Sequence, residues 1–163
     1  MSPVICCALV VLIAVADQLI KLAVLGSSLV GGETVTVIDG FLQFRYVENI
    51  GAAFSLFEDK TVLLSIFSAL VMAVGFYLLI ARKFKSKVLI ASVVMVMGGG
   101  LGNLIDRVRL SFVVDYIEAL FIDFPVFNFA DCFITVGEFV LIGYLLWDIY
   151  RDFRKGRAET NGK

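Results

Sequence analysis

The sequence contains no histidine, and this absence removes several kinds of chemistry. Without imidazole there is no Ser-His or Cys-His nucleophile, no histidine-ligated haem, and few ways to build a zinc site. Only three cysteines occur, Cys6, Cys7 and Cys132, and no Cys-x-x-Cys spacing is present. Neither a disulfide framework nor a thiolate metal site is therefore indicated. We expect all three cysteines to be small buried hydrophobic side chains.

Charged residues are also scarce, at 18% of the 163 residues, against about 25% in soluble domains. Hydrophobic residues make up 60% of the chain, and the mean hydropathy is +0.96. A soluble globule of this composition cannot cover its surface with polar side chains, so the chain is predicted to be a membrane protein. The formal net charge is −1, so the chain lacks the excess of positive charge that is typical of nucleic-acid-binding proteins, and we expect no nucleic-acid partner.

Four apolar segments are long enough to cross a bilayer, which takes about 20 helical residues. Residues 61–81 and 88–105 contain no charged side chain, and residues 132–147 contain only Glu138. The first segment, residues 3–25, contains Asp17, Gln18 and Lys21. We predict a membrane α-helical fold with four transmembrane helices, over about 3–25, 61–81, 88–107 and 131–150, in a single polytopic domain of residues 1–163.

The first segment has a second interpretation, as a cleaved signal peptide. Ala14, Val15 and Ala16 resemble a signal-peptidase site before Asp17. Against this, residues 1–7 contain no Lys or Arg, and the apolar pattern resumes after Lys21. A retained first helix is therefore favoured.

Lysine and arginine are unevenly distributed among the connections, which predicts the orientation in the membrane. The connection between the second and third helices contains Arg82, Lys83, Lys85 and Lys87. The segment after the fourth helix contains Arg151, Arg154, Lys155, Arg157 and Lys163. The two longer connections contain few basic residues and several acidic ones. Both termini and the short middle loop are thus expected to face the cytoplasm, and the longer connections to face outward.

The first outward connection has the pattern of a β-hairpin. Residues 33–39 and 41–47 are rich in β-branched and aromatic side chains, and Asp39-Gly40 between them is a turn signal. Residues 112–117 form a candidate third strand. We therefore expect a small extracytoplasmic β-platform, with a β-rich segment over about 33–57, on the outer face of the bundle.

Polar residues converge near one predicted depth, the outer membrane boundary. Asp17 and Lys21 are four residues apart in the outer half of the first helix, so they share a face and can pair. The outer ends of the third and fourth helices and both outward loops add Asn49, Asn103, Asp106, Arg107, Asp115, Asn128 and Asp131. An ionisable group at the centre of a membrane helix costs roughly 2.5–3.5 kcal/mol, so each is a functional candidate.

Some of these polar residues have an alternative, purely structural interpretation as ion pairs that hold the helices together. Asp17 would pair with Lys21, and Asp106 with Arg107 or Arg109, to close the bundle. Asp115 and Asp131 have no basic partner nearby in the sequence, so this interpretation is weaker for them.

Two features of the helices are predicted to serve packing. Gly98 and Gly102 form a small-xxx-small face that is expected to bring Asn103 and Arg107 close to the fourth helix. Glu138 is expected to be a hydrogen-bonding group in the bundle. It lies on a polar stripe of the fourth helix with Asn128, Asp131 and Thr135.

The strongest reactive candidates are Asp115 and Asp131, because the chain lacks histidine and a plausible metal cluster. Two neighbouring carboxylates cannot both ionise cheaply, so one keeps its proton while the other stays charged. The charged carboxylate can take a proton from water as the water attacks a carbonyl. The protonated one can polarise that carbonyl and later protonate the leaving amine. Topology places both residues at the same surface.

Five sequence blocks together resemble a known family. They are DQLIK at 17–21, NIGAAF at 49–54, GNLIDR at 102–107, VVDY at 113–116 and FNFAD at 127–131. In this order, and with four predicted helices, they are similar to lipoprotein signal peptidase, the type II signal peptidase of bacteria. The resemblance covers nearly the whole chain.

The resemblance implies a membrane aspartic endopeptidase of the bacterial cytoplasmic (inner) membrane, with the active site at the outer leaflet. Its substrate would be a diacylglyceryl-modified prolipoprotein, cleaved on the N-terminal side of the lipidated Cys beside membrane lipid. Asp115 and Asp131 match the catalytic pair. The implied substrate-binding or site-supporting residues are Asp17, Lys21, Asn49, Gly51, Asn103, Arg107 and Asn128. No cofactor, metal or obligate protein partner is implied, and the chain is expected to act as a monomer.

Three other functions are compatible with a polytopic chain of this composition. A small ion- or proton-coupled transporter would use Asp17, Lys21, Asp106 and Glu138 as a relay. A metal-dependent lipid transferase would bind Mg²⁺ with the acidic residues between positions 106 and 131. A non-catalytic membrane scaffold would tolerate substitution of either Asp115 or Asp131.

Overall fold

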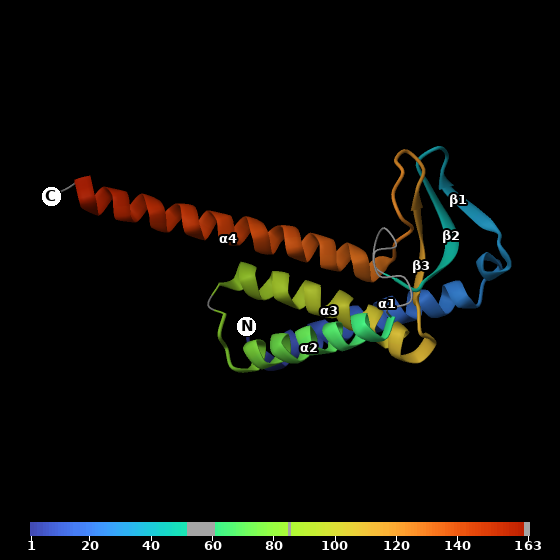
Figure 1. The fold of residues 1–163 in the computed structure, drawn as a ribbon, viewed down its shortest axis with the longest axis horizontal. Helices are drawn as coiled ribbons and strands as arrows, with labels where there is room; N and C mark the ends of the chain where they lie inside the picture. Colours follow the sequence, from blue (N-terminus) through green and yellow to red (C-terminus); the bar gives the residue numbers. More distant parts are fainter. Residues whose placement is uncertain (52–60, 85, 162–163) are drawn as a thin grey trace.

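The computed structural model describes residues 1–51, 61–84 and 86–161, with the backbone alone for Thr61 and residues 155–161. The long helices are α1 (Pro3–Leu25), α2 (Thr61–Ile80), α3 (Lys87–Leu110) and α4 (Phe129–Asn161). A short 3₁₀ helix, η1 (Ser28–Gly31), follows α1. A small sheet lies at one end of the helices, which we call the sheet end (Figure 1). The N-terminus and the α2–α3 connection lie at the opposite end (Figure 1).

The predicted fold class is confirmed. Among the described residues, four helices have stretches long and apolar enough to cross a membrane: Pro3–Leu25, Val62–Ile80, Lys87–Leu110 and Phe129–Arg154. In α4 the helix continues to Asn161, past the predicted end at residue 150. Loss of hydropathy marks where a span leaves the membrane, but it does not end a helix when the following residues include no proline.

The first helix is part of the folded bundle. Ser2 caps its N-terminus by accepting a hydrogen bond from the Ile5 amide at 3.3 Å, and Pro3 occupies the first turn, where its missing N–H is harmless. The helix packs along α3 and buries Asp17 and Lys21. This packing agrees with a retained helix.

The sheet contains three antiparallel strands in the order β1 (Thr34–Ile38), β2 (Leu42–Asn49) and β3 (Val113–Ala119). Gly40 forms the β1–β2 turn in the left-handed conformation, at φ 64°. The predicted β-rich segment reaches residue 57, but its part from 52 to 57, which includes the end of the NIGAAF block, lies outside the described residues. The β2–β3 register pairs Val47 with Asp115, so the end of β2 lies beside the start of β3.

Helix α3 is central and packs against the other three helices. A hydrophobic core of Cys6, Val10, Met72, Leu79, Ile90, Val94 and Met97 fills the space between α1, α2 and α3. A second cluster beneath the sheet contains Val24, Leu29, Val114 and Tyr116. Of the three cysteines only Cys6 is buried; Cys7 and Cys132 are partly exposed, so the expectation was wrong for these two.

The glycines of α3 allow close packing, but the predicted face was wrong. Gly98 lies against Ile13 and Gly102 against Asp17, so these two glycines face α1. The face toward α4 belongs to Gly99, which contacts the backbone of Ala130. Adjacent helical residues point about 100° apart, so one glycine run serves two neighbours. The small-xxx-small spacing shows that a helix can approach closely, but it does not say which helix.

We expect Gly99→Ala to destabilise the protein by about 1–3 kcal/mol, because the new methyl would overlap the backbone carbonyl of Ala130. Gly143→Ala is the matched control in α4. A methyl there has no heavy atom within 4 Å, and alanine is the better helix former. Unfolding in detergent measures both variants. Equal stability of the two proteins would contradict the close packing of α3 and α4.

Candidate active site

A buried ionic network lies where α1 and α3 meet near the sheet end. The Lys21 ammonium is 2.9 Å from carboxylate oxygens of both Asp17 and Asp106, and it donates a hydrogen bond to Asn103 Oδ1 at 2.8 Å. Lys21, Asp17 and Asp106 are each at most 1% exposed. Lys21 therefore uses its three donors on three acceptors, which offsets the desolvation of its charge.

The predicted pairing of Asp106 with Arg107 or Arg109 was wrong. Asp106 points toward α1 and pairs with Lys21. Arg107, one position later, points about 100° away around the helix and lines a cavity instead. The predicted pairing of Asp17 with Lys21 is confirmed at 2.9 Å.

The same network connects four elements of the fold. Asp17 Oδ1 accepts a hydrogen bond from the Ala130 amide of α4 at 3.1 Å, and Asp106 Oδ2 accepts one from the Val114 amide of β3 at 3.1 Å. Gln18 Nε2 donates to Asp106 Oδ1 at 2.8 Å. The sequence analysis did not predict this structural role of Gln18. Its position in the DQLIK block, beside Asp17, was the available signal.

Asp115 lies on β3 with both carboxylate oxygens hydrogen-bonded. Asn128 Nδ2 donates to Oδ1 at 2.7 Å, and Asn49 Nδ2 donates to Oδ2 at 2.8 Å. The Gly51 amide donates to Asn49 Oδ1 at 3.1 Å, which orients the Asn49 amide group so that its nitrogen meets Asp115. These contacts join the end of β2 to the first half of β3.

Asp131 lies in the first turn of α4, and its oxygens also accept hydrogen bonds. Asn103 Nδ2 donates to Oδ1 at 2.8 Å, and the Asn128 backbone amide donates to Oδ2 at 3.1 Å. In return, the Asp131 amide donates to Asn128 Oδ1 at 3.0 Å. Asn128 therefore donates a hydrogen bond to each of the two aspartates, through its side chain to Asp115 and through its backbone to Asp131.

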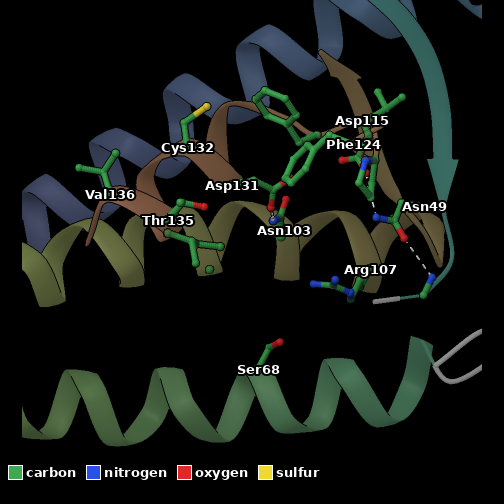
Figure 2. A pocket seen from close by; sticks show the side chains of 16 residues that line it. Asn49, Ser68, Asn103, Arg107, Asp115, Phe124, Asp131, Cys132, Thr135 and Val136 are labelled. Carbon is green, nitrogen blue, oxygen red and sulfur yellow. Dashed lines mark hydrogen bonds between the residues drawn. The ribbon is translucent and has the colours of Figure 1, made fainter. Parts of the chain in front are cut away.

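The two aspartates line one cavity of about 700 Å³. Figure 2 shows Asp131 and Asn103 near its centre, with Ser68 of α2 across the space. The predicted residues that line it are Asn49, Gly51, Asn103, Arg107, Asp115 and Asp131. Asp17, Lys21 and Asn128 are buried behind this surface. Further lining residues, not predicted from the sequence, are Ser68, Phe124, Phe127, Cys132, Thr135 and Val136.

The pKa of Asp115 is raised to about 7, mainly by burial and also by the negative charge of Asp131. The hydrogen bonds from Asn49 and Asn128 act in the opposite direction, because they favour the ionised carboxylate. Asp115 is 1% exposed, so desolvation is the larger cause. A carboxyl group with this pKa can hold a proton near neutral pH.

The prediction for Glu138 was wrong. Its side chain is exposed, and it makes no hydrogen bond to the described residues. It lies seven positions after Asp131, on the same side of α4, but beyond the packed part of the site. Within the described ranges, no group of three His, Cys, Asp or Glu side chains is placed to hold a metal ion.

The chain is similar to one family of known proteins along most of its length. The profile of the family described as Signal peptidase (SPase) II matches residues 9–147. The lipoprotein signal peptidase of Lactobacillus johnsonii is 37% identical over 86% of this chain and 91% of its own length. That of Enterococcus faecalis is 39% identical over 80% of each chain. A solved bacterial membrane enzyme superposes over 88% of both chains with a TM-score of 0.80 and 29% identity.

Residues 9–147, which the family profile matches, include the sheet, both aspartates and parts of all four long helices. The family match, the curated relatives and the solved structure agree on one kind of protein. The chain belongs to the signal peptidase II family and is a multi-pass membrane peptidase of lipoprotein processing.

Proposed function

We propose that this chain cleaves diacylglyceryl-modified prolipoproteins on the N-terminal side of the lipidated cysteine, with Asp115 and Asp131 activating the attacking water. One observation carries the proposal. Both carboxylates line the same cavity, and Asn128 donates a hydrogen bond to each of them. A shared donor holds the two groups in one arrangement, which acid–base chemistry by a pair requires.

In the proposed reaction the two aspartates hold one proton between them. The ionised carboxylate removes a proton from water as the water oxygen bonds to the scissile carbonyl carbon, and the protonated carboxyl gives its proton to the carbonyl oxygen. The tetrahedral intermediate then collapses. The carboxylate that gave its proton takes one back from a hydroxyl of the intermediate, the carbon–nitrogen bond breaks, and the carboxyl that took the proton from water protonates the leaving amine. The products are the signal peptide and a lipoprotein with a free N-terminal amine, and the pair again holds one proton.

The surrounding polar residues are proposed to hold the substrate backbone and the dyad. Arg107, Asn49 and Gly51 line the cavity, and Arg107 has no carboxylate within ion-pair distance among the described residues, so it is free to bind substrate carbonyl groups. Asn103 and Asn128 orient the carboxylates. Asp17 and Lys21 support the site from α1.

The substrate is proposed to enter sideways from the lipid, between α2 and α4. An apolar groove of about 370 Å³ lies between α2, α3 and α4, farther from the sheet than the active-site cavity. It is lined by Leu70, Val71, Val74, Gly75, Leu78, Phe84, Val93, Val96, Met97 and Leu141. Such a groove suits the apolar parts of a lipidated signal peptide. If cross-links from substrate acyl chains never reached residues of α2, α3 or α4 beside the cavity, this route would be excluded.

The proposed location is the bacterial cytoplasmic membrane, with both termini in the cytoplasm and the sheet end outside. Basic residues of the α2–α3 connection and of the end of α4 lie at the end opposite the sheet, which supports this orientation. The active site is then at the outer leaflet, where the diacylglyceryl group of the substrate stays in lipid. We propose that residues 1–163 act as a single domain and as a monomer, with no obligate protein partner.

The pH dependence of cleavage follows from Asp115. We expect kcat/KM to fall as pH rises through about 7, because the pair then loses the proton that the carbonyl oxygen needs.

The stability of the fold is also expected to decrease as pH rises over this range. The folded carboxyl binds a proton up to about pH 7, whereas the unfolded one releases it near its ordinary value of 3.8, so the free energy of unfolding decreases between these values.

A matched variant sharpens this prediction. Asn49→Leu removes a donor that favours the ionised form of Asp115, so the fall in kcat/KM is expected to move to higher pH. The measurement is the full pH profile of both proteins on one lipidated substrate. An unchanged position of the fall in Asn49→Leu would contradict the assignment of this titration to Asp115.

A chelator experiment separates the proposal from the lipid transferase, and a vesicle experiment separates it from the transporter. Cleavage of a diacylglyceryl-modified prolipoprotein by the purified protein is expected to be unaffected by EDTA. Proton or ion flux in proteoliposomes is expected to equal that of empty vesicles. Loss of cleavage in EDTA would favour the metal-dependent alternative, and flux with no cleavage would favour the transporter.

A further inference from the structure

We propose that a second cavity, at the end of the bundle opposite the sheet, binds the phosphate headgroup of an anionic phospholipid. The cavity has a volume of about 210 Å³. It is formed where the start of α1, the end of α2 and the start of α3 meet. The residues that line it are Met1, Cys6, Leu79, Arg82, Phe84, Lys87 and Ile90. None of them belongs to the candidate active site.

Two cations line this cavity without a carboxylate to neutralise them. Within the described parts of the chain, neither Arg82 nor Lys87 has an acidic oxygen within 4.0 Å, whereas Lys21, Arg45 and Arg151 each have at least one. A guanidinium and an ammonium together match a phosphodiester, because the guanidinium donates two parallel hydrogen bonds and the ammonium adds a point charge. The charge of the cavity therefore selects an anion.

The backbone at Arg82 gives an independent indication. The Lys83 amide donates to Leu78 O at 3.0 Å and the Arg82 amide to Leu79 O at 3.2 Å, which is the hydrogen-bond pattern of a Schellman cap. Arg82 occupies the left-handed position of this cap, at φ 51°, where glycine is usual. An arginine held in a disfavoured conformation beside a cavity indicates that its side chain has a role there.

The position and the remaining walls favour a lipid over a free phosphate. The span of α2 ends at Ile80 and that of α3 begins at Lys87, so the two cations lie at the depth of the headgroups. The other walls are apolar, with Cys6, Leu79 and Ile90 each at most 8% exposed. A phosphodiester would contact the cations while the first carbons of its glycerol and acyl chains contact these walls.

The test measures how many phosphatidylglycerol molecules the full-length protein retains. The protein is purified from mixed vesicles of phosphatidylglycerol and phosphatidylcholine, and the lipids bound to it are counted by native mass spectrometry. Arg82→Gln/Lys87→Gln is compared with Lys83→Gln/Arg154→Gln, which removes the same charge from exposed positions that do not line the cavity. We expect at least a tenfold loss of retained phosphatidylglycerol in the first variant, and retention close to that of the unmodified protein in the second.

Two further arms make the result decisive. Arg82→Gly removes the cation and relieves the left-handed backbone, so this variant is expected to unfold at the same or a higher temperature and still lose the lipid. Inorganic phosphate at millimolar concentration is expected not to displace the lipid. Equal losses in the two charge-matched variants, no loss in either, or displacement by inorganic phosphate would each overturn the proposal.

Discussion

Cleavage of a diacylglyceryl-modified prolipoprotein is expected to fall by a factor on the order of 10³ in Asp115→Asn and also in Asp131→Asn. An amide cannot remove a proton from water, and it cannot supply an O–H to the carbonyl oxygen. Each aspartate accepts hydrogen bonds from two donors, one on each carboxylate oxygen. In asparagine an NH₂ group replaces one of these oxygens, so one of the two donors would face another donor and lose its hydrogen bond. The measurement is kcat in detergent, together with a thermal unfolding scan of each variant.

Each substitution has a matched control on its own element. Glu118→Gln changes a carboxylate on β3 that pairs with Arg45 outside the cavity. Glu138→Gln changes one on α4, two turns after Asp131. Both controls are expected to keep kcat within about twofold. If a folded Asp115→Asn or Asp131→Asn protein cleaved as fast as its control, that aspartate would have no part in the reaction.

The second large effect is expected at Lys21, and it concerns stability. Lys21→Met leaves the carboxylates of Asp17 and Asp106 buried beside each other with no cation. Removing one partner of a buried ionic group typically costs about 3–5 kcal/mol, because the remaining charges stay desolvated. We therefore expect this loss in the free energy of unfolding, measured by detergent-induced denaturation in mixed micelles.

Two companion variants test the cause of that loss. Arg45→Met breaks the ion pair with Glu118, in which the arginine side chain is 48% exposed. Because water screens this pair, we expect the free energy of unfolding to decrease by at most about 1 kcal/mol. Adding Asp17→Asn and Asp106→Asn to Lys21→Met removes the unpaired charges and is expected to restore part of the stability. A Lys21→Met protein no less stable than Arg45→Met would show that the network contributes little.

The elements that were predicted correctly depend on local signals. Long runs without charge predict the spans because bilayer thickness alone determines the required length. The Asp39-Gly40 pair predicts the hairpin because few residues other than glycine adopt its left-handed turn position. In both cases the chain needs no information from distant residues.

The errors concern contacts between segments that are distant in the sequence. Asp106 has two arginines close by in the sequence, yet its partner is Lys21, 85 positions earlier on α1. Gly98 and Gly102 share a face, but α1 rather than α4 occupies it. Spacing tells which residues share a face of a helix; which neighbour that face meets depends on how the whole bundle packs.

The candidate site, like the fold, was predicted in part from the sequence. The two aspartates, Asn49, Asn103 and Asn128 were assembled from the resemblance and from topology, and the structure brings them together. Ser68 was missed because a serine in an apolar helix has no pattern to distinguish it from a packing residue.

The central claim is that the aspartate pair activates water directly, and oxygen isotope labelling tests it most directly. Excess EDTA-treated enzyme would cleave a diacylglyceryl-modified prolipoprotein once in H₂¹⁸O, followed by mass spectrometry of the released signal peptide and of the protein. We predict one ¹⁸O atom in the new C-terminal carboxylate of the signal peptide and none in Asp115 or Asp131. Label in either aspartate, or no cleavage after EDTA treatment, would contradict the account.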